Sequence, residues 1–486
     1  MKRYTALADI KADVNSGKLR IVDLAEHYLS RIKEYERLNA YLEVYEDEVR
    51  KKAQFLQDHW NEERDKPLSG MFIALKDMIS YKDHPLSASS KALTGFTALY
   101  NATVTERLIE AGAIILGRLN CDEFAMGGSN ETSYFGAVKN YDDETRVSGG
   151  SSGGSGVAVQ ADLCLAALGT DTGGSIRQPS SFCGVYGLKP TYGRVSRYGV
   201  VAFASSFDQV GPITQSLSDS ALILEVIGGV DIHDATTSKE PIPKFSIPKS
   251  EPLGKKKIAY IEETLTSSGL DPEVREGIQG LINTLKKEGH EVVPVSFPLL
   301  EYVVPTYYIL TTAEASSNLS RYDGVHFGYR SPAAHDLEST YKLSRSEGFG
   351  REVKRRIMLG TFVLSAGYYD AYYSKAQKVR RLIQDATRKI LESHDFILTP
   401  TTPSVAFKIG EKLSDPIVMY LEDIFTVQAS LTGFPAISLP LFRNSEGLAF
   451  GTQILAGPFQ EEPLFDFSEY LENLIPSEIK KSLETN

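Results

Sequence analysis

Residues 149–155 read Gly-Gly-Ser-Ser-Gly-Gly-Ser, and residues 171–177 read Asp-Thr-Gly-Gly-Ser-Ile-Arg. Each stretch places a serine, Ser151 or Ser175, in a glycine-rich turn. Glycine adopts backbone conformations that other residues avoid, and it lets neighbouring groups approach closely. A Thr-Gly-Gly-Ser turn can therefore aim several backbone N–H groups at one point beside a hydroxyl, as an acyl-transfer site requires. The two turns predict a serine hydrolase.

Short apolar segments alternate with helical patterns on both sides of these turns. Such alternation predicts an α/β fold, with a sheet covered by helices. We expect strands at 71–75, 113–117, 163–168, 258–261, 291–295, 396–398, 436–439 and 453–455, and helices at 104–111, 156–161, 272–288 and over most of 306–394. The helix that starts at Pro272 has clear boundary signals, because Asp271 is a candidate N-cap and Gly289 ends the pattern.

The chain of 486 residues is long enough for several domains, although one large α/β domain is also allowed. Residues 1–65 carry helical periodicity and many charges, and we expect them to form an N-terminal helical arm packed on the core. Residues 66–486 would form a single large domain. Within it, residues 232–257 are rich in Pro, Ser and Lys and predict a surface excursion.

The composition excludes several classes of function. The net charge of −11 argues against a chain that grips DNA or RNA by itself, because such binding needs clusters of Lys and Arg. Three cysteines are too few for a disulfide framework and lack metal-ligand spacing, so we expect no metal site. No apolar run is long enough for a membrane span or follows Lys2 and Arg3 as a signal peptide would. A cytoplasmic location is expected.

A serine nucleophile needs a base, and the residues point to lysine. The chain has eight histidines, none in a recognisable motif with either serine, and no Gly-x-Ser-x-Gly elbow surrounds Ser175. Lys76 follows five apolar residues, so its backbone should enter the interior, where burial lowers the pKa of an amine. Ser151 can relay a proton between Lys76 and Ser175, because a hydroxyl both donates and accepts.

Each of these features also has a simpler interpretation. A Gly/Ser-rich stretch is more often a linker or turn, and a lysine after a strand is usually a solvated strand end. Residues 149–156 could instead present N–H groups to a phosphate, although they lack the Gly-Lys-Ser/Thr ending of a P-loop.

The combined pattern resembles the amidase signature family. The two glycine-rich stretches carry the resemblance, together with Ala-Leu-Lys-Asp at 74–77, and it extends from about residue 20 to 470. It implies an α/β/α sandwich around a mixed sheet and a Ser–cis-Ser–Lys triad. Ser175 would be the nucleophile, Ser151 the bridging hydroxyl after a cis peptide bond from Gly150, and Lys76 the base. The oxyanion hole would be formed by the backbone N–H groups of Thr172, Gly173, Gly174 and Ser175.

Further stretches resemble the branch of this family that serves tRNA-dependent amidotransferases. They are residues 122–129, 189–197, 203–206, 314–321 and 346–356, whereas Ser148 stands where the family commonly has proline. The resemblance implies that glutamine is the substrate, with Arg356 binding its carboxylate and Asp423 its ammonium group. A guanidinium suits a carboxylate because it pairs in bidentate fashion. By the same resemblance, Tyr307, Gly127 and Ser129 would line the substrate site.

The branch also implies partners. Ammonia would pass to a second (B) component of an amidotransferase complex, which holds the misacylated tRNA and uses ATP and Mg²⁺. A small third (C) component would complete a heterotrimer. This chain itself would hold no cofactor. Two rivals stay open: a stand-alone amidase of another small amide, and a catalytically silent scaffold. The sequence does not decide between Glu-tRNA(Gln) and Asp-tRNA(Asn), nor whether the isolated chain is active.

Overall fold

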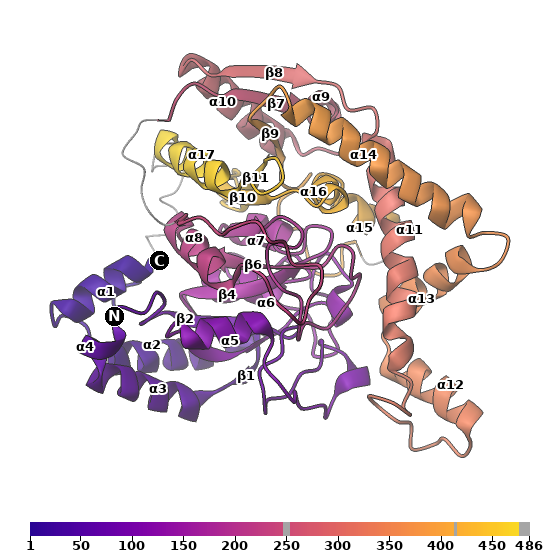
Figure 1. Cartoon of the computed structure of the whole chain (residues 1–486), viewed down its shortest axis with the longest axis horizontal. Coiled ribbons are helices and arrows are strands. Elements are labelled where there is room, and N and C mark those ends of the chain that lie inside the picture. Colours follow the sequence, from indigo (N-terminus) through magenta and orange to yellow (C-terminus); the bar gives the residue numbers. More distant parts are fainter. Residues whose placement is uncertain (246–252, 413–415, 476–486) are drawn as a thin grey trace.

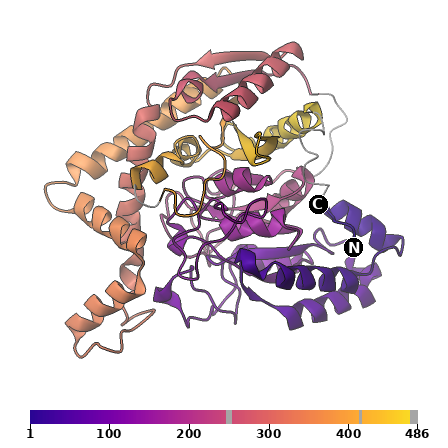
Figure 2. The same ribbon diagram turned by 180° about the vertical axis from the view of Figure 1, so that it is seen from behind.

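The computed structural model describes residues 1–245, 253–412 and 416–475. An eleven-stranded sheet forms its centre, and helices lie on either side of the sheet (Figures 1 and 2). The strand order is β1-β3-β2-β4-β6-β5-β10-β11-β9-β7-β8. Parallel pairs occur around β2 and β7, whereas the other neighbours are antiparallel, so the sheet is mixed. The predicted α/β class is confirmed.

The strands are β1 (Tyr41–Val44), β2 (Phe72–Lys76), β3 (Ile114–Leu119), β4 (Ala166–Asp171), β5 (Tyr186–Lys189), β6 (Gln209–Thr214), β7 (Lys257–Ile261), β8 (Glu291–Val295), β9 (Phe396–Pro400), β10 (Ala436–Arg443) and β11 (Ala449–Leu455). The helices of the first half are α1 (Leu7–Asn15), α2 (Ile21–Glu34), α3 (Glu46–Asp58), α4 (Trp60–Glu63), α5 (Thr103–Glu110), α6 (Gly153–Gln160), α7 (Arg177–Cys183) and α8 (Leu217–Ile227). Those of the second half are α9 (Glu262–Thr266), α10 (Pro272–Lys287), α11 (Leu300–Asn318), α12 (Leu337–Gly348), α13 (Arg351–Leu364), α14 (Lys375–Leu391), α15 (Pro416–Leu421), α16 (Val427–Thr432) and α17 (Glu461–Leu474).

The N-terminal 65 residues are mostly helical, as expected, but they also supply a strand. β1 pairs antiparallel with β3 at one edge of the sheet. The helices α1–α4 surround this edge, at the end of the molecule opposite β7, β8 and α10 (Figure 1). The segment is therefore more than an arm, because it extends the central sheet. The four-residue strand has no strong apolar alternation to reveal it, since all its residues are only partly buried.

Two parallel neighbours, β2 and β4, end side by side. β2 ends at Lys76, and β4 ends at Asp171, where the second glycine-rich turn begins. The first glycine-rich stretch leads directly into α6, and the second into α7. Both helices pack on the central strands. This arrangement brings the lysine and both turns to the same end of the central strands, where β2 and β4 finish.

The expected strands beyond residue 250 and the helix boundaries at Asp271 and Pro272 are confirmed. The Asp271 side chain caps α10, and Gly289 follows the helix with a φ of +85°. Two boundaries near the site are wrong. The strand expected at 163–168 is β4 at Ala166–Asp171, because Leu163 still bonds back to α6 through the Ala158 carbonyl and the apolar run marks burial rather than pairing.

The second boundary error concerns the helix expected at 156–161, which begins at Gly153. The glycines of its first turn serve close packing, since a Cβ at Gly154 would lie 2.7 Å from the carbonyl oxygen of Ala40. Glycine composition indicates a turn, but tertiary contact with the neighbouring segment explains why these positions are helical.

A layer of helices from the second half stands along one side of the molecule. α11 packs against α13 and α14, and α12 projects from the end of this layer (Figure 1). α11 carries Tyr307 and Tyr308, and α13 carries Arg356. The predicted helical character of 306–394 is confirmed, and this layer faces the glycine-rich turns.

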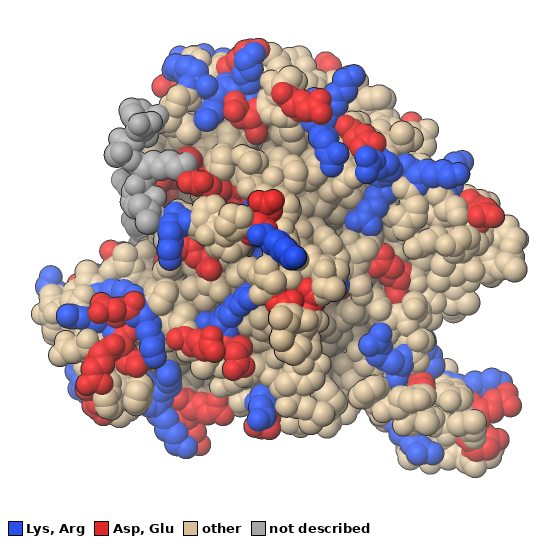
Figure 3. All heavy atoms as spheres, viewed as in Figure 1, with Lys and Arg blue, Asp and Glu red and all other residues tan. Residues whose placement is uncertain are grey.

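Residues 232–245 and 253–256, at the two ends of the predicted excursion, contain no helix or strand. Residues 246–252 of that excursion, and residues 476–486 at the end of the expected domain, lie outside the described residues. Lys and Arg are interspersed with Asp and Glu on the face seen in Figure 3, apart from a run of basic side chains over α14. Among the described residues, no helix is long and apolar enough to cross a membrane.

Matched glycine-to-alanine changes test the β1–β3 edge. Gly117→Ala should destabilise the protein by about 1–3 kcal/mol, because a Cβ on Gly117 would overlap the carbonyl oxygen of Glu43 in β1. Gly280→Ala, on a face of α10 with no atom nearby, should instead stabilise by up to about 1 kcal/mol. Chemical denaturation measures both. Equal effects of the two changes would contradict the assignment of β1 to the sheet.

Candidate active site

Lys76 ends β2 with its side chain fully buried. Its Nζ lies 2.7 Å from Ser151 Oγ, 2.9 Å from Ser152 Oγ and 2.9 Å from Thr170 Oγ1. All three partners are hydroxyls, so no carboxylate offsets the charge of the ammonium form by direct contact. Burial of an unpaired charge is costly, and the amine avoids that cost by losing its proton.

Burial accordingly lowers the pKa of Lys76 to about 8, although more distant groups, Cys121 and Asp122 first among them, act to raise it. An amine with such a pKa is half neutral at pH 8 and about one-tenth neutral at pH 7. Neutral lysine has a lone pair that can accept a proton from the nearest hydroxyl, Ser151 Oγ. The environment expected for a lysine base is therefore present.

Ser151 is fully buried and follows a cis peptide bond from Gly150, as the family resemblance implied. Two hydrogen bonds fix this turn. The Gly150 N–H donates to Gln178 Oε1 at 2.8 Å, and the Asp122 N–H donates to the Ser151 carbonyl at 3.1 Å. The bridging position of Ser151 is thus defined by a side chain of α7 and a backbone group of the preceding loop.

Ser175 lies at the start of α7 with 7% of its surface exposed. Its carbonyl accepts a hydrogen bond of 3.1 Å from the Ser152 N–H, which joins the two glycine-rich turns. The structure therefore places Lys76 in direct contact with Ser151 and joins the turn of Ser151 to that of Ser175 through the backbone, although no hydrogen bond links Ser151 Oγ to Ser175 Oγ among the described residues. Of the three, Ser175 is the most accessible to a substrate.

The expected oxyanion hole needs one correction. The Gly174 N–H donates to Asp171 Oδ1 at 2.9 Å, so it is already engaged. In the part of the chain that the structure describes, the N–H groups of Thr172, Gly173 and Ser175 have no protein acceptor. These three remain as donors for a developing oxyanion. The role of Gly174 is conformational, with a φ of +137° and no room for a Cβ against Thr426.

Two buried carboxylates hold this turn, and sequence reasoning missed both. Asp171 bonds the Gly174 and Ile176 N–H groups and forms an ion pair with buried Arg177 at 2.9 Å. Burial alone acts to raise the pKa of Asp171, but the charge and hydrogen bonds of Arg177 outweigh it and keep the pKa below its usual value. Asp208 accepts a hydrogen bond of 2.7 Å from Thr172 Oγ1. The acid-plus-arginine spacing at 171 and 177 was the available signal for the first of these contacts.

Tyr307 of α11 covers the second turn. A Cβ on Gly173 would lie 2.6 Å from the Tyr307 ring and hydroxyl, so the aromatic ring packs directly on the glycine. The ring also meets Phe207 edge to face. This placement suits the wall expected of Tyr307, and it limits access of water to the donors of the turn.

Arg356 lies in an aromatic cage. Its guanidinium carbon is 5.1 Å from the ring centre of Tyr308 and 5.6 Å from those of Tyr420 and Phe203. Its Nε donates to Glu352 Oε1 at 2.8 Å, and the Tyr420 hydroxyl donates to the same oxygen at 2.8 Å. The two terminal nitrogens have no protein acceptor within the described residues, so they can take a carboxylate in bidentate fashion.

Asp423 supplies the opposite charge. It follows α15 in the chain and receives a hydrogen bond of 3.3 Å from the Tyr308 hydroxyl. Burial raises the pKa of Asp423 to about 7, while Arg356 acts to lower it. A partly buried carboxylate of this kind can take a cation, because an ammonium group beside it would favour its ionised form.

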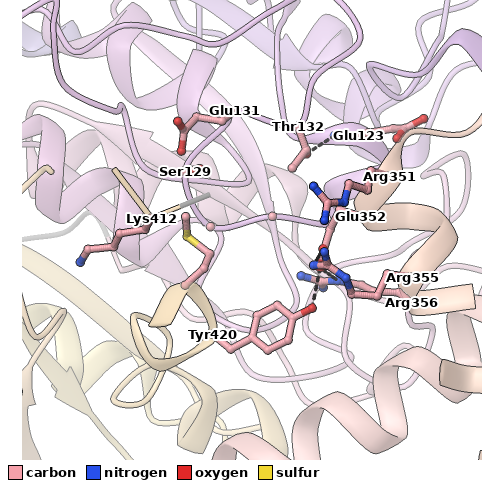
Figure 4. A pocket seen from close by; sticks show the side chains of 13 residues that line it. Glu123, Ser129, Glu131, Thr132, Arg351, Glu352, Arg355, Arg356, Lys412 and Tyr420 are labelled. Atoms are coloured by element: carbon pink, nitrogen blue, oxygen red, sulfur yellow. Dashed lines mark hydrogen bonds and ion pairs between the residues drawn. The ribbon is translucent and has the colours of Figure 1, made fainter. Parts of the chain in front are cut away.

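A cavity of about 330 Å³ opens beside these charges, and Figure 4 shows the side chains that surround it. Its lining includes Arg356 and the predicted residues Gly127 and Ser129, together with Gly128. The lining includes neither the three triad residues nor Gln178 and Asp423. Gly128 lies close to the last two, since a Cβ on it would be 3.5 Å from Gln178 Nε2 and 3.8 Å from Asp423 Oδ1.

The predicted residues therefore form two groups: an amine–hydroxyl cluster with oxyanion donors, and a pocket that is lined by a buried cation and has a partly buried carboxylate near Gly128. Together they can cleave an amide that carries both charges at its far end. Sequence reasoning missed Asp122, Gln178, Glu352 and Tyr420. Among the described residues no cluster of three or more His, Cys, Asp or Glu could hold a metal ion.

Comparison with known proteins agrees with this geometry. Residues 23–465 match the Amidase family. The chain is 48% identical to the A component of the Glutamyl-tRNA(Gln) amidotransferase of Chlorobium luteolum, over 97% of each chain. It is 50% identical to the protein of that name from Koribacter versatilis, over 93% of this chain and 94% of the relative. Among solved structures, the corresponding Glutamyl-tRNA(Gln) amidotransferase component of Thermotoga maritima is 39% identical, covers 94% of this chain and 92% of its own, and superposes with a TM-score of 0.76.

The pKa of Lys76 predicts the pH dependence of Ser175 reactivity. Lys76 must be neutral to accept a proton, so the rate of covalent labelling by a fluorophosphonate should rise with pH, reach half its maximum near pH 8 and level off above about pH 9. Lys76→Arg should lower the rate about 100-fold or more at every pH, because arginine stays charged. Mass spectrometry measures the labelled fraction, with Ser175→Ala as the unlabelled control. A wild-type rate that is constant from pH 6 to 9 would contradict the lysine base.

Proposed function

The chain belongs to the amidase signature family, and from that premise we propose that it hydrolyses glutamine as the ammonia-producing component of a tRNA-dependent amidotransferase. Its relatives of about 48% identity over nearly their full length carry an amidotransferase name. The observation that carries the choice of glutamine is a buried cation, Arg356, in the lining of the cavity together with a partly buried carboxylate, Asp423, whose pKa Arg356 acts to lower. Glutamine has a carboxylate and an ammonium group on the carbon farthest from its amide.

The reaction follows from the geometry of the cluster. Neutral Lys76 accepts a proton from Ser151, which takes one from Ser175 as the Ser175 oxygen attacks the amide carbon of glutamine. The amide oxygen becomes an oxyanion held by the N–H groups of Thr172, Gly173 and Ser175. The C–N bond then breaks, and the relay returns the proton to the departing nitrogen, which leaves as ammonia.

A water molecule completes the cycle. It loses a proton through the same relay and attacks the ester carbon of the glutamyl-Ser175 intermediate. A second tetrahedral state collapses, the bond to Ser175 Oγ breaks, and that oxygen regains its proton. Glutamate is released with an α-carboxylate at Arg356 and an ammonium group at Asp423. The products balance the substrates: glutamine and water give glutamate and ammonia.

The other members of the complex belong to the same proposal. Ammonia passes to the B component, which binds Glu-tRNA(Gln) or Asp-tRNA(Asn) and activates it with ATP and Mg²⁺, and the small C component completes a heterotrimer in the cytoplasm. The net charge of −11 supports this division, because the tRNA is then held by the partner. No cofactor is required in this chain.

Two alternatives predict different behaviour. A stand-alone amidase for apolar amides has no use for a buried guanidinium in an aromatic cage with a partly buried carboxylate nearby. A catalytically silent scaffold has no use for a lysine whose burial lowers its pKa to about 8. Both features lower the stability of the folded protein, and a function in binding or catalysis explains why they are present.

Ser175→Ala separates ammonia production from its use. In the complex with its partner proteins, the variant should lose glutamine-dependent amidation by about 10⁴-fold or more, because no other group can form the acyl intermediate. Amidation with added ammonium chloride should stay at the wild-type rate. Both rates are measured as Gln-tRNA or Asn-tRNA formed. Loss of both activities would contradict the role of Ser175 as the nucleophile alone.

The two charged residues can be tested with analogues that each lack one group of glutamine. Arg356→Ala should raise KM for glutamine about 10–100-fold, because a charge-assisted pair is lost, but leave 4-aminobutanamide, which has no carboxylate, unchanged. Asp423→Asn should weaken binding of glutamine but not of glutaramate, which has no ammonium group. Steady-state ammonia release measures each KM.

The same substrates carry a pH signature. Asp423 must be ionised to bind an ammonium group, and its pKa of about 7 means that KM for glutamine falls as the pH rises through 7. Glutaramate should show no such change. If Arg356→Ala impairs all three amides equally, the chain is an amidase of another specificity.

A further inference from the structure

Gln178 is the second residue of α7, three positions after Ser175, and its side chain is fully buried. Its amide group has a fixed orientation. The Oε1 atom accepts the hydrogen bond of 2.8 Å from the Gly150 N–H, and only the oxygen end of an amide can accept it. The Nε2 atom must therefore be the end that points away from the first glycine-rich turn.

This Nε2 has no hydrogen-bond partner among the described residues. Leaving a buried donor unpaired costs about 1–3 kcal/mol, so an unpaired amide nitrogen in a protein interior usually faces a ligand or a water site. The oxygen of the same amide is bonded to the Gly150 N–H. The side chain is therefore fixed through Oε1, and its Nε2 is free to donate to a ligand or a water molecule.

The position of Gly128 shows what Nε2 faces. The point where a Cβ of residue 128 would lie is 3.5 Å from Gln178 Nε2, 3.7 Å from Met419 Sδ and 3.8 Å from Asp423 Oδ1, at ordinary contact distance from all three. Gly128 and Met419 line the cavity of about 330 Å³ that contains Arg356, whereas Gln178 and Asp423 are not in its lining. A substrate group that reaches this point beside Gly128 would meet a donor and a carboxylate together.

We propose that Gln178 is a substrate-binding residue, whose Nε2 donates a hydrogen bond to the α-carboxylate of the amino-acid amide. The inference rests on the proposed function and extends it. A donor repels an ammonium group and pairs with an oxygen, so Asp423 takes the ammonium while Gln178 and Arg356 share the carboxylate on the same carbon. Gln178 then couples recognition to catalysis, because its other end holds the peptide before Ser151.

This arrangement favours α-amino-acid amides over simple amides. A substrate without a carboxylate leaves the Gln178 donor unpaired, and sites built to bond a polar group reject analogues that lack it. The residue lies in the glycine-rich turn of the nucleophile rather than near Arg356 in the sequence. Substrate selection is therefore partly encoded beside Ser175 itself.

Gln178→Glu is the sharpest test, because it keeps an oxygen for the Gly150 N–H and exchanges only the Nε2 donor for a second oxygen. In the complex, KM for L-glutamine should rise about 10-fold or more, since a carboxylate now faces the substrate carboxylate. KM for 4-aminobutanamide should stay within about threefold of the wild type. Fluorophosphonate labelling of Ser175 should be unchanged, which shows that the turn is intact.

The outcomes distinguish failure of the proposed function from failure of the role proposed for Gln178. Wild-type protein that does not hydrolyse glutamine overturns the proposed function. If the wild type does hydrolyse it and Gln178→Glu leaves its KM unchanged, only the role of Gln178 is overturned. A parallel loss of labelling and of turnover for both amides means that Gln178 acts solely by holding Gly150, which also overturns the inference.

Gly128→Ala tests the same point without a change of charge. Gly128 lies outside the left-handed backbone region, so alanine is allowed there, and its methyl group would fill the space in front of Nε2. KM for glutamine should rise about 10-fold, with thermal stability and Ser175 labelling unchanged. An unaltered KM would show that the substrate does not approach Gln178 and would overturn the inference even if Gln178→Glu fails to fold.

Discussion

The proposed chemistry of this protein depends on an amine that is buried among neutral polar groups. Lys76 contacts the hydroxyls of Ser151, Ser152 and Thr170 and the carbonyl of Thr170, and no carboxylate touches its Nζ within the described chain. A carboxylate in contact would stabilise the ammonium form and remove the basicity that the proposed relay needs. That relay needs no histidine, because desolvation gives the lysine a pKa of about 8. The sheet supplies this environment by ending two parallel strands side by side.

Carboxylates are nevertheless abundant around the site, and three of them hold the turn of Ser175 and the loop before the cavity. Asp171 bonds the Gly174 and Ile176 N–H groups, Asp208 accepts from the Thr172 hydroxyl, and Asp122 bonds the Asn130 and Thr132 N–H groups. Glycine-rich chain has little rigidity of its own. Buried acid-to-backbone hydrogen bonds provide the rigidity that preorganised N–H donors require. The glycine residues allow the conformation of the turns, and the surrounding acidic side chains hold the turns in that conformation.

The α/β class could be predicted from the sequence, and so could the residues that contribute to the candidate site. Alternating apolar segments indicate buried strands, and Lys76 could be identified because it ends such a segment. Boundaries near the turns were wrong because burial does not specify which residues pair. The strand β1 was not predicted from the sequence, because its residues are only partly buried and show no apolar alternation. Gly174 was assigned an oxyanion role that its bond to Asp171 excludes, since a motif specifies residue types and not hydrogen-bond partners.

The groups that would cleave the amide and most of those that would recognise it come from different parts of the chain, and the layer of α11 to α14 contributes to recognition. The amine, both hydroxyls and the oxyanion donors all come from residues 76–175, whereas the aromatic cage and its arginine come mainly from later segments that pack against them. Bond cleavage is therefore encoded in an earlier stretch of the gene, whereas recognition of the amide is shared between that stretch, which carries Gly127, Ser129 and Gln178, and a later one. A ribosome completes the cleaving groups first, and changes in the later stretch can alter the choice of amide while the amine and the hydroxyls stay as they are.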